Sequence, residues 1–355
     1  MASSGIFDKR LVFVTGKGGV GKTTVAAALG LAAARAGKRT IVCEVAQQER
    51  ISTVFGRKGV GHSETKVAPR LFAMSIDPQR SMEEYLREQV GAPLYGLLFE
   101  NRLFQYLAAA TPGMRELLTM GKIWELAQLE RRSASAAPYD VVIVDAPATG
   151  HGLGFLRTPR TFREAARVGK IRRQADIIDG FISDPTCTGV VTVAVPEEMP
   201  VNETLDFRDA LRDEMGMDID AVVVNAVYPE RFSDEEAEQI ERAVDSNGSP
   251  GVLAALRAGL FEHHRAVTQR AELIRLRKAL GYSPLTLPYL FQPDLDRAAF
   301  ELLSQELEAG LGPAGYARPE AEGHDQGAGP DAPRSYARPE AESHNQGAGP
   351  DAPRR

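Results

Sequence analysis

The chain has 355 residues, of which 43% are hydrophobic, and it carries a formal net charge of −6 at pH 7. This length is enough for one large domain or two ordinary ones around a sizeable core. The acidic balance excludes a general electrostatic attraction to nucleic acid, so no nucleic-acid partner is expected. The two cysteines, Cys43 and Cys187, lie far apart in the sequence, which excludes a disulfide framework and a clustered thiol metal site.

The N-terminal stretch MASSGIFDKR lacks the apolar run of a signal peptide. No run of about eighteen apolar residues predicts a membrane-spanning helix. Together with the two widely separated cysteines, these features predict a cytoplasmic protein. Peripheral contact with a membrane stays open as an alternative.

Short runs rich in β-branched residues alternate with longer helical patterns along most of the chain. The predicted strands are 11–15, 39–45, 71–76, 139–146, 188–195, 220–227 and 284–288. Most of them are continuous apolar runs, which is typical of strands buried on both faces of a parallel sheet. A helix is predicted over 22–37 because alanines and leucines dominate it and Gly37 is suited to end it. The predicted fold class is therefore α/β, with a doubly wound, mainly parallel sheet.

The end of the chain is a repeat of low complexity. Residues 316–334 recur almost unchanged at 336–354, and the repeat unit is rich in Pro, Gly, Ala and Glu. Such a composition buries too little apolar surface to offset chain entropy. We expect a folded domain over 8–311 and a disordered tail over 312–355.

The segment GKGGVGKT at 16–23 lies between the first predicted strand and the first predicted helix. It fits the phosphate-binding loop pattern G-x-x-x-x-G-K-[ST] in full. The backbone N–H groups of such a loop surround phosphates, its lysine (Lys22) reaches the β- and γ-phosphates, and its hydroxyl (Thr23) ligates Mg²⁺. ATP and Mg²⁺ are the predicted ligands. The predicted nucleotide-binding residues are Gly16, Lys17, Gly18, Gly19, Val20, Gly21, Lys22, Thr23 and Thr24.

Lys17 is a second lysine in this loop. A lysine here resembles the deviant loop of one branch of P-loop ATPases, which includes the nitrogenase iron protein, the partitioning and cell-division ATPases and the ArsA-type ATPases. In that branch the lysine reaches the partner's phosphates across a dimer interface, as an arginine finger does. The resemblance implies that Lys17 is catalytic and that the chain forms a homodimer, or a heterodimer with a related ATPase subunit.

The segment VVIVDAPATGHGLGFL at 141–156 resembles the D-T-A-P-T-G-H switch of the ArsA family. That family comprises arsenite-pump ATPases and the ATPase that delivers tail-anchored proteins to the endoplasmic reticulum. Asp145 ends the strand, at the position of an acidic residue that holds Mg²⁺ through water. A strand followed by Pro-Glu at 191–204 also resembles this family, and the resemblance extends over residues 8–310.

Two further segments carry predicted contacts to the adenine base, which the resemblance implies. The strand at 222–229 contains Asn225, which corresponds to the family's adenine-contacting asparagine. The segment LPYLFQPD at 287–294 resembles the late loop that closes over the base, with Pro288, Tyr289 and Phe291 as the contacting residues.

The sequence departs from the family at its first switch, which reads roughly D-P-A-H there and CEVAQQERIS at 43–52 here. The acidic residue is Glu44, which is one methylene longer than the aspartate that orients the attacking water. We predict that Glu44 positions the attacking water. Its longer side chain changes the geometry of that contact, so slow hydrolysis is expected. Arsenite-binding thiols and the C-x-x-C zinc site are absent from the sequence, and Cys43 is expected to be an inert core thiol.

Two helical insertions, 77–135 and 155–186, flank the strand at 139–146, where the family builds a lid. Residues 112–131 are amphipathic, and the apolar side fits either a client groove or packing on the protein's own sheet. The apolar side consists of Met114, Leu117, Leu118, Ile123, Trp124 and Leu129. The second insertion is basic and fits either an acidic partner or lipid surface or an ordinary solvated face. Its basic residues are Arg157, Arg160, Arg163, Arg167, Lys170, Arg172 and Arg173.

These features predict an Mg·ATP-dependent dimeric ATPase of ArsA type that couples ATP binding and hydrolysis to a hydrophobic client or a membrane partner. An arsenite-efflux pump subunit is one alternative. A regulator that is switched by ATP and has negligible turnover is another, and a partitioning-type nucleic-acid binder is a third.

Overall fold

The computed structural model describes residues 5–45, 50–56, 59–85, 87, 113–130, 137–166, 168–245, 248–292 and 294–312. All of them belong to one compact unit, residues 1–319. The predicted tail from residue 313 onward lies outside the described residues. So do residues 86, 88–112 and 131–135 of the first predicted insertion.

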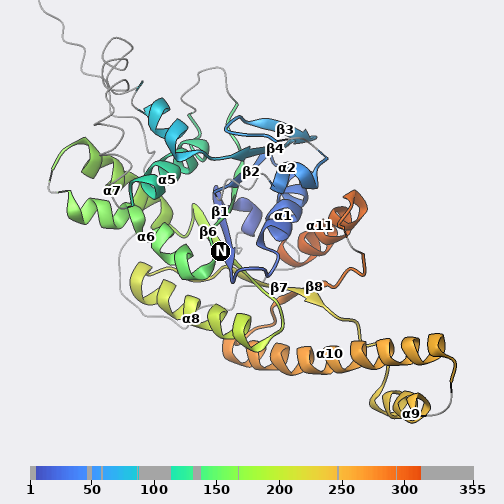
Figure 1. The fold of residues 1–355 in the computed structure, drawn as a ribbon. Helices are drawn as coiled ribbons and strands as arrows, with labels where there is room; N and C mark the ends of the chain where they lie inside the picture. Colours follow the sequence, from blue (N-terminus) through green and yellow to red (C-terminus); the bar gives the residue numbers. More distant parts are fainter. Residues whose placement is uncertain are drawn as a thin grey trace, which may run out of the picture. The chain divides into compact units, whose positions relative to one another are not determined.

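The described residues form an eight-stranded sheet in the order β3-β4-β2-β5-β1-β6-β7-β8 (Figure 1). Every neighbouring pair is parallel except β3 and β4, so the predicted doubly wound, mainly parallel sheet is confirmed. The strands are β1 (Leu11–Gly16), β2 (Thr40–Glu44), β3 (Thr65–Ala68), β4 (Leu71–Ser75), β5 (Val141–Asp145), β6 (Thr188–Ala194), β7 (Ala221–Val227) and β8 (Leu285–Pro288).

Seven of these strands were predicted. Their observed bounds differ from the predicted bounds by at most two residues at either end. The unpredicted strand, β3, is a short antiparallel edge strand whose four residues are all at least partly exposed. It therefore lacks the continuous apolar run that identifies the central strands.

The central strands are apolar throughout because both of their faces are covered. Val12 and Val14 of β1 contribute to one hydrophobic cluster, and Leu11 and Phe13 contribute to the other. All four are at most 1% exposed, as expected when successive side chains of a strand point to opposite faces.

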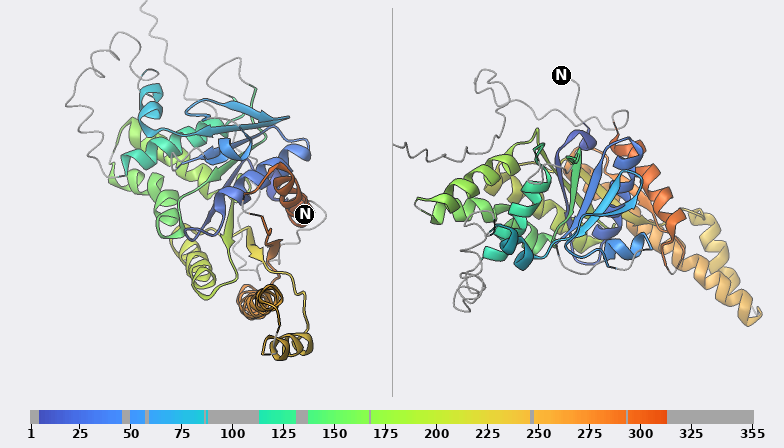
Figure 2. Two further views of the ribbon diagram at one scale, coloured as in Figure 1. Left: turned by 45° about the vertical axis from the view of Figure 1, so that its right-hand side comes forward. Right: turned by 90° about the horizontal axis from the view of Figure 1, so that it is seen from above.

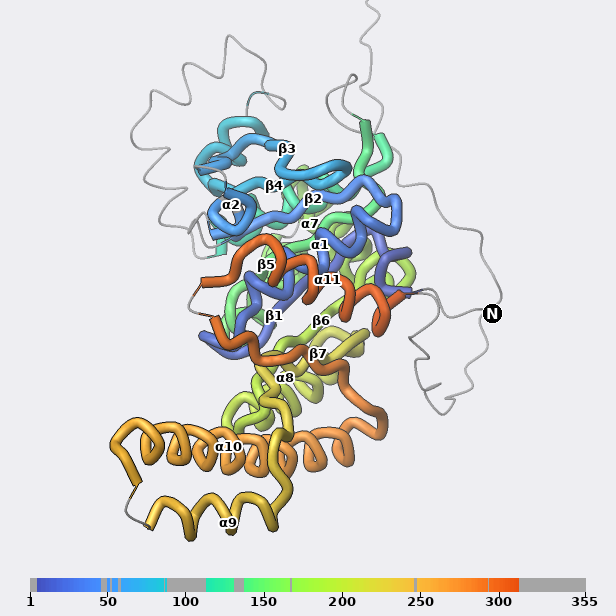
Figure 3. Tube along the Cα trace, turned by 90° about the vertical axis from the view of Figure 1, so that its right-hand side faces the viewer, coloured from blue at the N-terminus to red at the C-terminus, as the bar shows by residue number. Residues whose placement is uncertain are grey.

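One face of the sheet is covered by α1 (Lys22–Arg35) and α11 (Arg297–Leu311), with the short α2 (Arg50–Val54) beside them (Figure 3). The small residues of α1 let it lie close to the strands. A Cβ added at Gly30 would lie 2.4 Å from Cγ2 of Val42, which leaves no room for a side chain there.

The other face is covered by α5 (Met114–Leu126), α6 (Thr149–Ala165), α7 (Lys170–Ser183) and α8 (Glu198–Met215) (Figure 2). The amphipathic segment 112–131 contains α5, and Ile123 is fully buried together with Met120 and Leu126. Leu129 lies beyond the helix and is 70% exposed. Of the predicted apolar side, Ile123 therefore packs into the protein's own core, while Met114, Leu117, Leu118 and Trp124 are partly buried.

The second predicted insertion begins earlier than expected, because α6 already starts at Thr149. Several of its basic side chains have acidic partners within the chain. Arg157 pairs with Glu214, and Arg163 lies 2.7 Å from the buried carboxylate of Asp179. Part of its basic character is thus neutralised internally, while Arg167 lies outside the described residues.

Two helices beyond the end of β7 form a hairpin that the sequence analysis did not predict. They are α9 (Asp234–Val244) and α10 (Pro250–Leu280), and α10 also contacts α8 (Figure 1). A short 3₁₀ helix, η1 (Ile6–Asp8), precedes β1. Within the described ranges, no helix is both long enough and apolar enough to cross a membrane.

Candidate nucleotide-binding site

The predicted phosphate-binding loop connects β1 to α1 at the carboxyl edge of the sheet, between β5 and β6. Ligands of doubly wound sheets bind at such a point. Two loop positions strongly favour glycine. Gly16 has φ +148° and its added Cβ would lie 2.0 Å from the carbonyl oxygen of Val193, while Gly21 caps α1 with φ +93°. The loop therefore turns tightly into the start of α1, where free N–H groups and the helix dipole favour an anion.

The side chains predicted to act on phosphate and Mg²⁺ lie together in this loop and at the end of β5. The hydroxyl of Thr23 donates a hydrogen bond to Oδ2 of Asp145 over 2.6 Å. Nζ of Lys22 donates to the carbonyl oxygen of Lys17 over 3.0 Å, so it lies over the loop. Burial lowers the pKa of Lys22, and the nearby carboxylates of Asp145 and Glu203 oppose that effect.

Asp145 is the acidic residue best placed to serve Mg²⁺. Burial raises its pKa above the ordinary value, and the Thr23 hydrogen bond and the cations of Lys22 and Arg50 oppose this. A buried carboxylate beside a hydroxyl offers the hard oxygen ligands that Mg²⁺ prefers. Among the residues that the structure describes, no group of three or more His, Cys, Asp or Glu side chains gathers as a metal cage. The donor set fits Mg²⁺, which commonly takes few protein ligands and completes its shell with phosphate and water.

Glu44 lies beside Asp145, because the two residues are partners in the register of β2 and β5. Its side chain is 3% exposed. Its Oε1 accepts a hydrogen bond from the backbone N–H of Arg50 over 2.8 Å and so stabilises the start of α2. The predicted water-positioning residue is therefore at the expected edge of the sheet, but one of its oxygens is committed to a backbone group.

Lys17 forms an ion pair with Glu203 on α8. The other oxygen of that carboxylate, Oε2, accepts a hydrogen bond from the hydroxyl of Thr149 over 3.0 Å. Thr149 begins α6, directly after the segment that follows Asp145. Glu203 therefore connects the phosphate-binding loop to the end of the segment 145–149, which resembles the family's second switch.

The residues predicted to contact adenine lie at the ends of β7 and β8. Nδ2 of Asn225 donates to the carbonyl oxygen of Val20 in the phosphate-binding loop over 3.0 Å. Pro288 pairs with Val227 in the sheet, and Tyr289 follows directly. These residues adjoin the loop through Asn225, which agrees with a place for the base at this edge.

Three aromatic rings cluster in the same region. Tyr289 stacks on Tyr228 with ring centroids 4.4 Å apart, and Phe291 meets both rings edge-on. The bulge that precedes Tyr228 is stabilised by Gln269 of α10, which accepts from the N–H of Tyr228 and donates to the carbonyl oxygen of Ala226. The α9–α10 hairpin is thus joined to the predicted base-binding end of the site.

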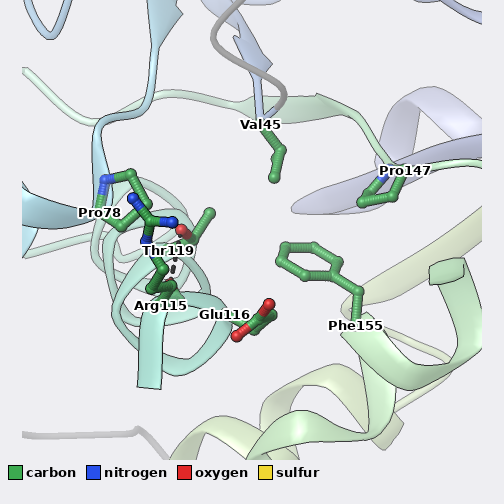
Figure 4. A pocket seen from close by; sticks show the side chains of 7 residues that line it. All are labelled: Val45, Pro78, Arg115, Glu116, Thr119, Pro147 and Phe155. Carbon is green, nitrogen blue, oxygen red and sulfur yellow. Dashed lines mark hydrogen bonds between the residues drawn. The ribbon is translucent and has the colours of Figure 1, made fainter. Parts of the chain in front are cut away.

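A pocket of about 240 Å³ lies between the residues that follow β2 and β5 and the helices α5 and α6 (Figure 4). Val45 follows Glu44, Pro147 lies two residues after Asp145, and both line the pocket together with Phe155 of α6. Its remaining lining residues are Pro78, Arg115, Glu116 and Thr119. A shift of either switch segment would therefore change the wall that α5 and α6 share with it.

The sequence analysis did not identify Glu203, Thr149, Tyr228 or Gln269 as site residues. Glu203 lies inside the segment 191–204 and Thr149 inside 141–156, and both segments were identified from the sequence by their resemblance to the family. Nothing local distinguishes Glu203 from the other glutamates of α8. Glu203 is identified as a site residue only by its contact with Lys17, which is 186 residues away in the sequence.

Comparison with known proteins identifies the family of the chain. A model of the anion-transporting ATPase family matches residues 9–179 and 166–247. The ATPase BagA of Mycobacterium tuberculosis is 30% identical over 300 residues, which cover 79% of this chain and 87% of that protein. A protein of Halobacterium salinarum whose name describes an arsenical pump-driving ATPase is 30% identical over 271 residues, 70% of this chain and 42% of that protein. The ATPase GET3 of Podospora anserina is 30% identical over 208 residues, 57% of each chain. The matches span the loop, both switch segments and most of the sheet, and this chain therefore belongs to the anion-transporting (ArsA-type) ATPase family.

Proposed function

We propose that the chain is an Mg·ATP-dependent ATPase that dimerises on binding ATP and couples ATP binding and hydrolysis to a hydrophobic client or a membrane partner. The observation that carries the proposal is the grouping of Lys22, Thr23 and Asp145 at one edge of the sheet, with the Thr23 hydroxyl 2.6 Å from the Asp145 carboxylate. Thr23 and Asp145 would hold Mg²⁺, which neutralises charge on the phosphates when bound. Lys22 would hold the β- and γ-phosphates.

Dimerisation is part of the proposal because of Lys17. A cation supplied by the partner stabilises charge as the phosphoryl group leaves, and only a closed dimer provides it. The partner is a second copy of this chain or a related subunit. The two cysteines, in a chain without a disulfide framework, support a cytoplasmic setting.

The lid supports the coupling to a client. The pocket of about 240 Å³ shares Val45 and Pro147 with the switch segments, so a nucleotide-dependent shift of either segment would reach α5 and α6. The chain is similar to proteins named ATPase GET3 and arsenical pump-driving ATPase. For this chain we propose a hydrophobic client or a membrane partner.

A second candidate function is an ATP-switched regulator with negligible turnover. Glu44 favours it, because its buried carboxylate caps α2 through the N–H of Arg50 instead of facing water freely. The arsenite-pump alternative has less support. Cys43 is 0% exposed within β2, and Cys187 is half-buried at the start of β6, far along the chain. An arsenite site needs several converging thiols.

The test compares ATP hydrolysis by the wild type, Lys17→Ala and Glu44→Ala with mass measured by light scattering, with and without a non-hydrolysable ATP analogue. The proposal expects an ATP-dependent dimer and loss of turnover in Lys17→Ala with nucleotide binding retained. Lys38→Ala is the matched control, because this half-exposed lysine pairs with Asp8 just beyond the other end of α1. A monomer that holds ATP intact, and in which Lys17→Ala changes nothing, would support the regulator instead.

A further inference from the structure

Lys17 has a partner on its own chain. Its ammonium group lies against Oε1 of Glu203 on α8, and the two side chains are 31% and 33% exposed. An ammonium group held there by a carboxylate is not available to another molecule, because it must first give up this ion pair.

Glu203 is itself fixed in place. The hydroxyl of Thr149 donates to its Oε2 over 3.0 Å, so the carboxylate has a donor on each oxygen. The hydrogen bond from Lys17 lowers the pKa of Glu203, with smaller contributions from Thr149 and Lys22. The carboxylate is therefore charged at neutral pH, and it is held at the same place by the second switch.

The position of Glu203 also makes the ion pair sensitive to nucleotide. Glu203 is close enough to Lys22 for the two charges to interact. Phosphates bound at Lys22 would add negative charge near the Glu203 carboxylate and would compete with it for Lys17. Nucleotide binding then weakens the hold of Glu203 on Lys17 by direct electrostatics.

We propose that Glu203 is a positioning residue that anchors Lys17 on its own chain and sets the threshold for ATP-dependent dimerisation. This inference rests on the proposed function, in which Lys17 acts on the partner's phosphates. Lys17 exchanges the Glu203 carboxylate for the phosphates of the other subunit when the dimer closes. Thr149 keeps the carboxylate at its place, so that the anchor re-forms when the dimer opens.

The expected effect is modest, because the pair is partly exposed. A surface ion pair of this kind corresponds to about a threefold change in an equilibrium constant. Closing a symmetric homodimer breaks two anchors, so removing Glu203 tightens the dimer by about tenfold. In a heterodimer with one such anchor the change is about threefold.

The experiment measures the dimer dissociation constant by sedimentation with a non-hydrolysable ATP analogue for wild type, Glu203→Gln and Glu197→Gln. Glutamine keeps the shape of the side chain and can still accept from Thr149, but it removes the charge that holds Lys17. Glu197 is the N-cap residue of the same helix and pairs with Arg265, so Glu197→Gln removes a partly exposed, ion-paired charge without touching the loop. We expect a tighter dimer for Glu203→Gln only.

A kinetic measurement separates anchoring from a role in hydrolysis. In Glu203→Gln, the protein concentration that gives half-maximal turnover falls by the same factor as the dissociation constant. If that concentration is unchanged while maximal turnover falls, Glu203 acts in the chemistry and the anchor is wrong. If the wild type dimerises with ATP and Glu203→Gln has the same dimer dissociation constant, the proposed anchoring role of Glu203 is also wrong. If the wild type never dimerises, the proposed function itself fails.

A double-mutant cycle with Lys17→Gln and Glu203→Gln tests the anchor without dimerisation. The free energy of unfolding, measured without nucleotide, should show a coupling between the two changes that high salt abolishes. The absence of coupling at low salt would overturn the proposal.

Discussion

Replacing Gly21 with alanine tests the geometry of the phosphate-binding loop directly. Gly21 has φ +93°, a left-handed conformation that costs an alanine about 1 kcal/mol. The added Cβ would also lie 2.3 Å from Nδ2 of Asn225, well inside contact distance. The amide must therefore move and lose its hydrogen bond to the carbonyl oxygen of Val20, which costs about 1 kcal/mol more. We expect Gly21→Ala to lower the free energy of unfolding by about 2 kcal/mol.

Gly37 provides a matched control within the same structural unit. It follows α1 with φ +87°, nearly the value at Gly21, but no heavy atom lies within 4 Å of its added Cβ. Gly37→Ala should therefore cost only the conformational part, about 1 kcal/mol, and leave nucleotide affinity unchanged. The difference between the two variants isolates the collision with Asn225.

Urea denaturation gives both free energies, and calorimetric titration with a non-hydrolysable ATP analogue gives the affinities. Gly21→Ala should weaken nucleotide binding, because the displaced Asn225 and the strained loop no longer present their groups together. In the background of Asn225→Ala the collision is gone, so the cost of Gly21→Ala should fall toward that of Gly37→Ala. If Gly21→Ala costs no more than Gly37→Ala in the wild-type background, Gly21 and Asn225 are not in contact and this reasoning is refuted.

Three further changes have defined outcomes. Thr23→Val should raise the Mg²⁺ concentration needed for half-maximal hydrolysis by about tenfold or more, and an unchanged Mg²⁺ titration would exclude Thr23 as a ligand. Burial raises the pKa of Asp145, so its contribution to the free energy of unfolding falls as pH rises through the folded-state pKa. Asp145→Asn should therefore raise the melting temperature measured without nucleotide at pH 7, and it should abolish Mg²⁺-dependent turnover. A lower melting temperature would contradict this. Burial raises the pKa of Glu84, but the neighbouring His62 and Lys122 outweigh it and lower that pKa from 4.5 to about 2. The resulting stability is complete above pH 4.5 and is lost as pH falls toward 2, so Lys122→Met should flatten the unfolding free energy over that range, and an equally steep acid profile would count against the pairing.

Local patterns in the sequence were sufficient for the sheet and for the centre of the site. Seven strands could be predicted because most of them are continuous apolar runs, and β3 could not because its partly exposed residues show no such run. The loop at 16–23 is contiguous, so its glycines and Lys22 are readable without any tertiary information. Asp145 could be predicted because it ends a buried strand, and the structure brings it to Thr23 across 122 residues.

The role of the lid depended on packing that periodicity cannot decide. An amphipathic helix has one apolar side whether that side meets the protein's own sheet or a partner. The burial of Ile123 shows that much of α5 packs inward, whereas Leu129 remains exposed. Likewise, Arg157 and Arg163 form ion pairs within the chain because the fold places acidic side chains beside them, and periodicity cannot predict those pairs.

By itself, the sequence determined the fold class, the nucleotide-binding loop and the family, because these depend on residues that are adjacent in the chain. Only the tertiary structure revealed the contact of Lys17 with Glu203 and the capping of α2 by Glu44. Glu203 lies on a helix and carries no local sign of which element it will face, because its contact with Lys17 joins elements 186 residues apart. The strand order that places β6, and the helix α8 that follows it, beside β1 decides that contact.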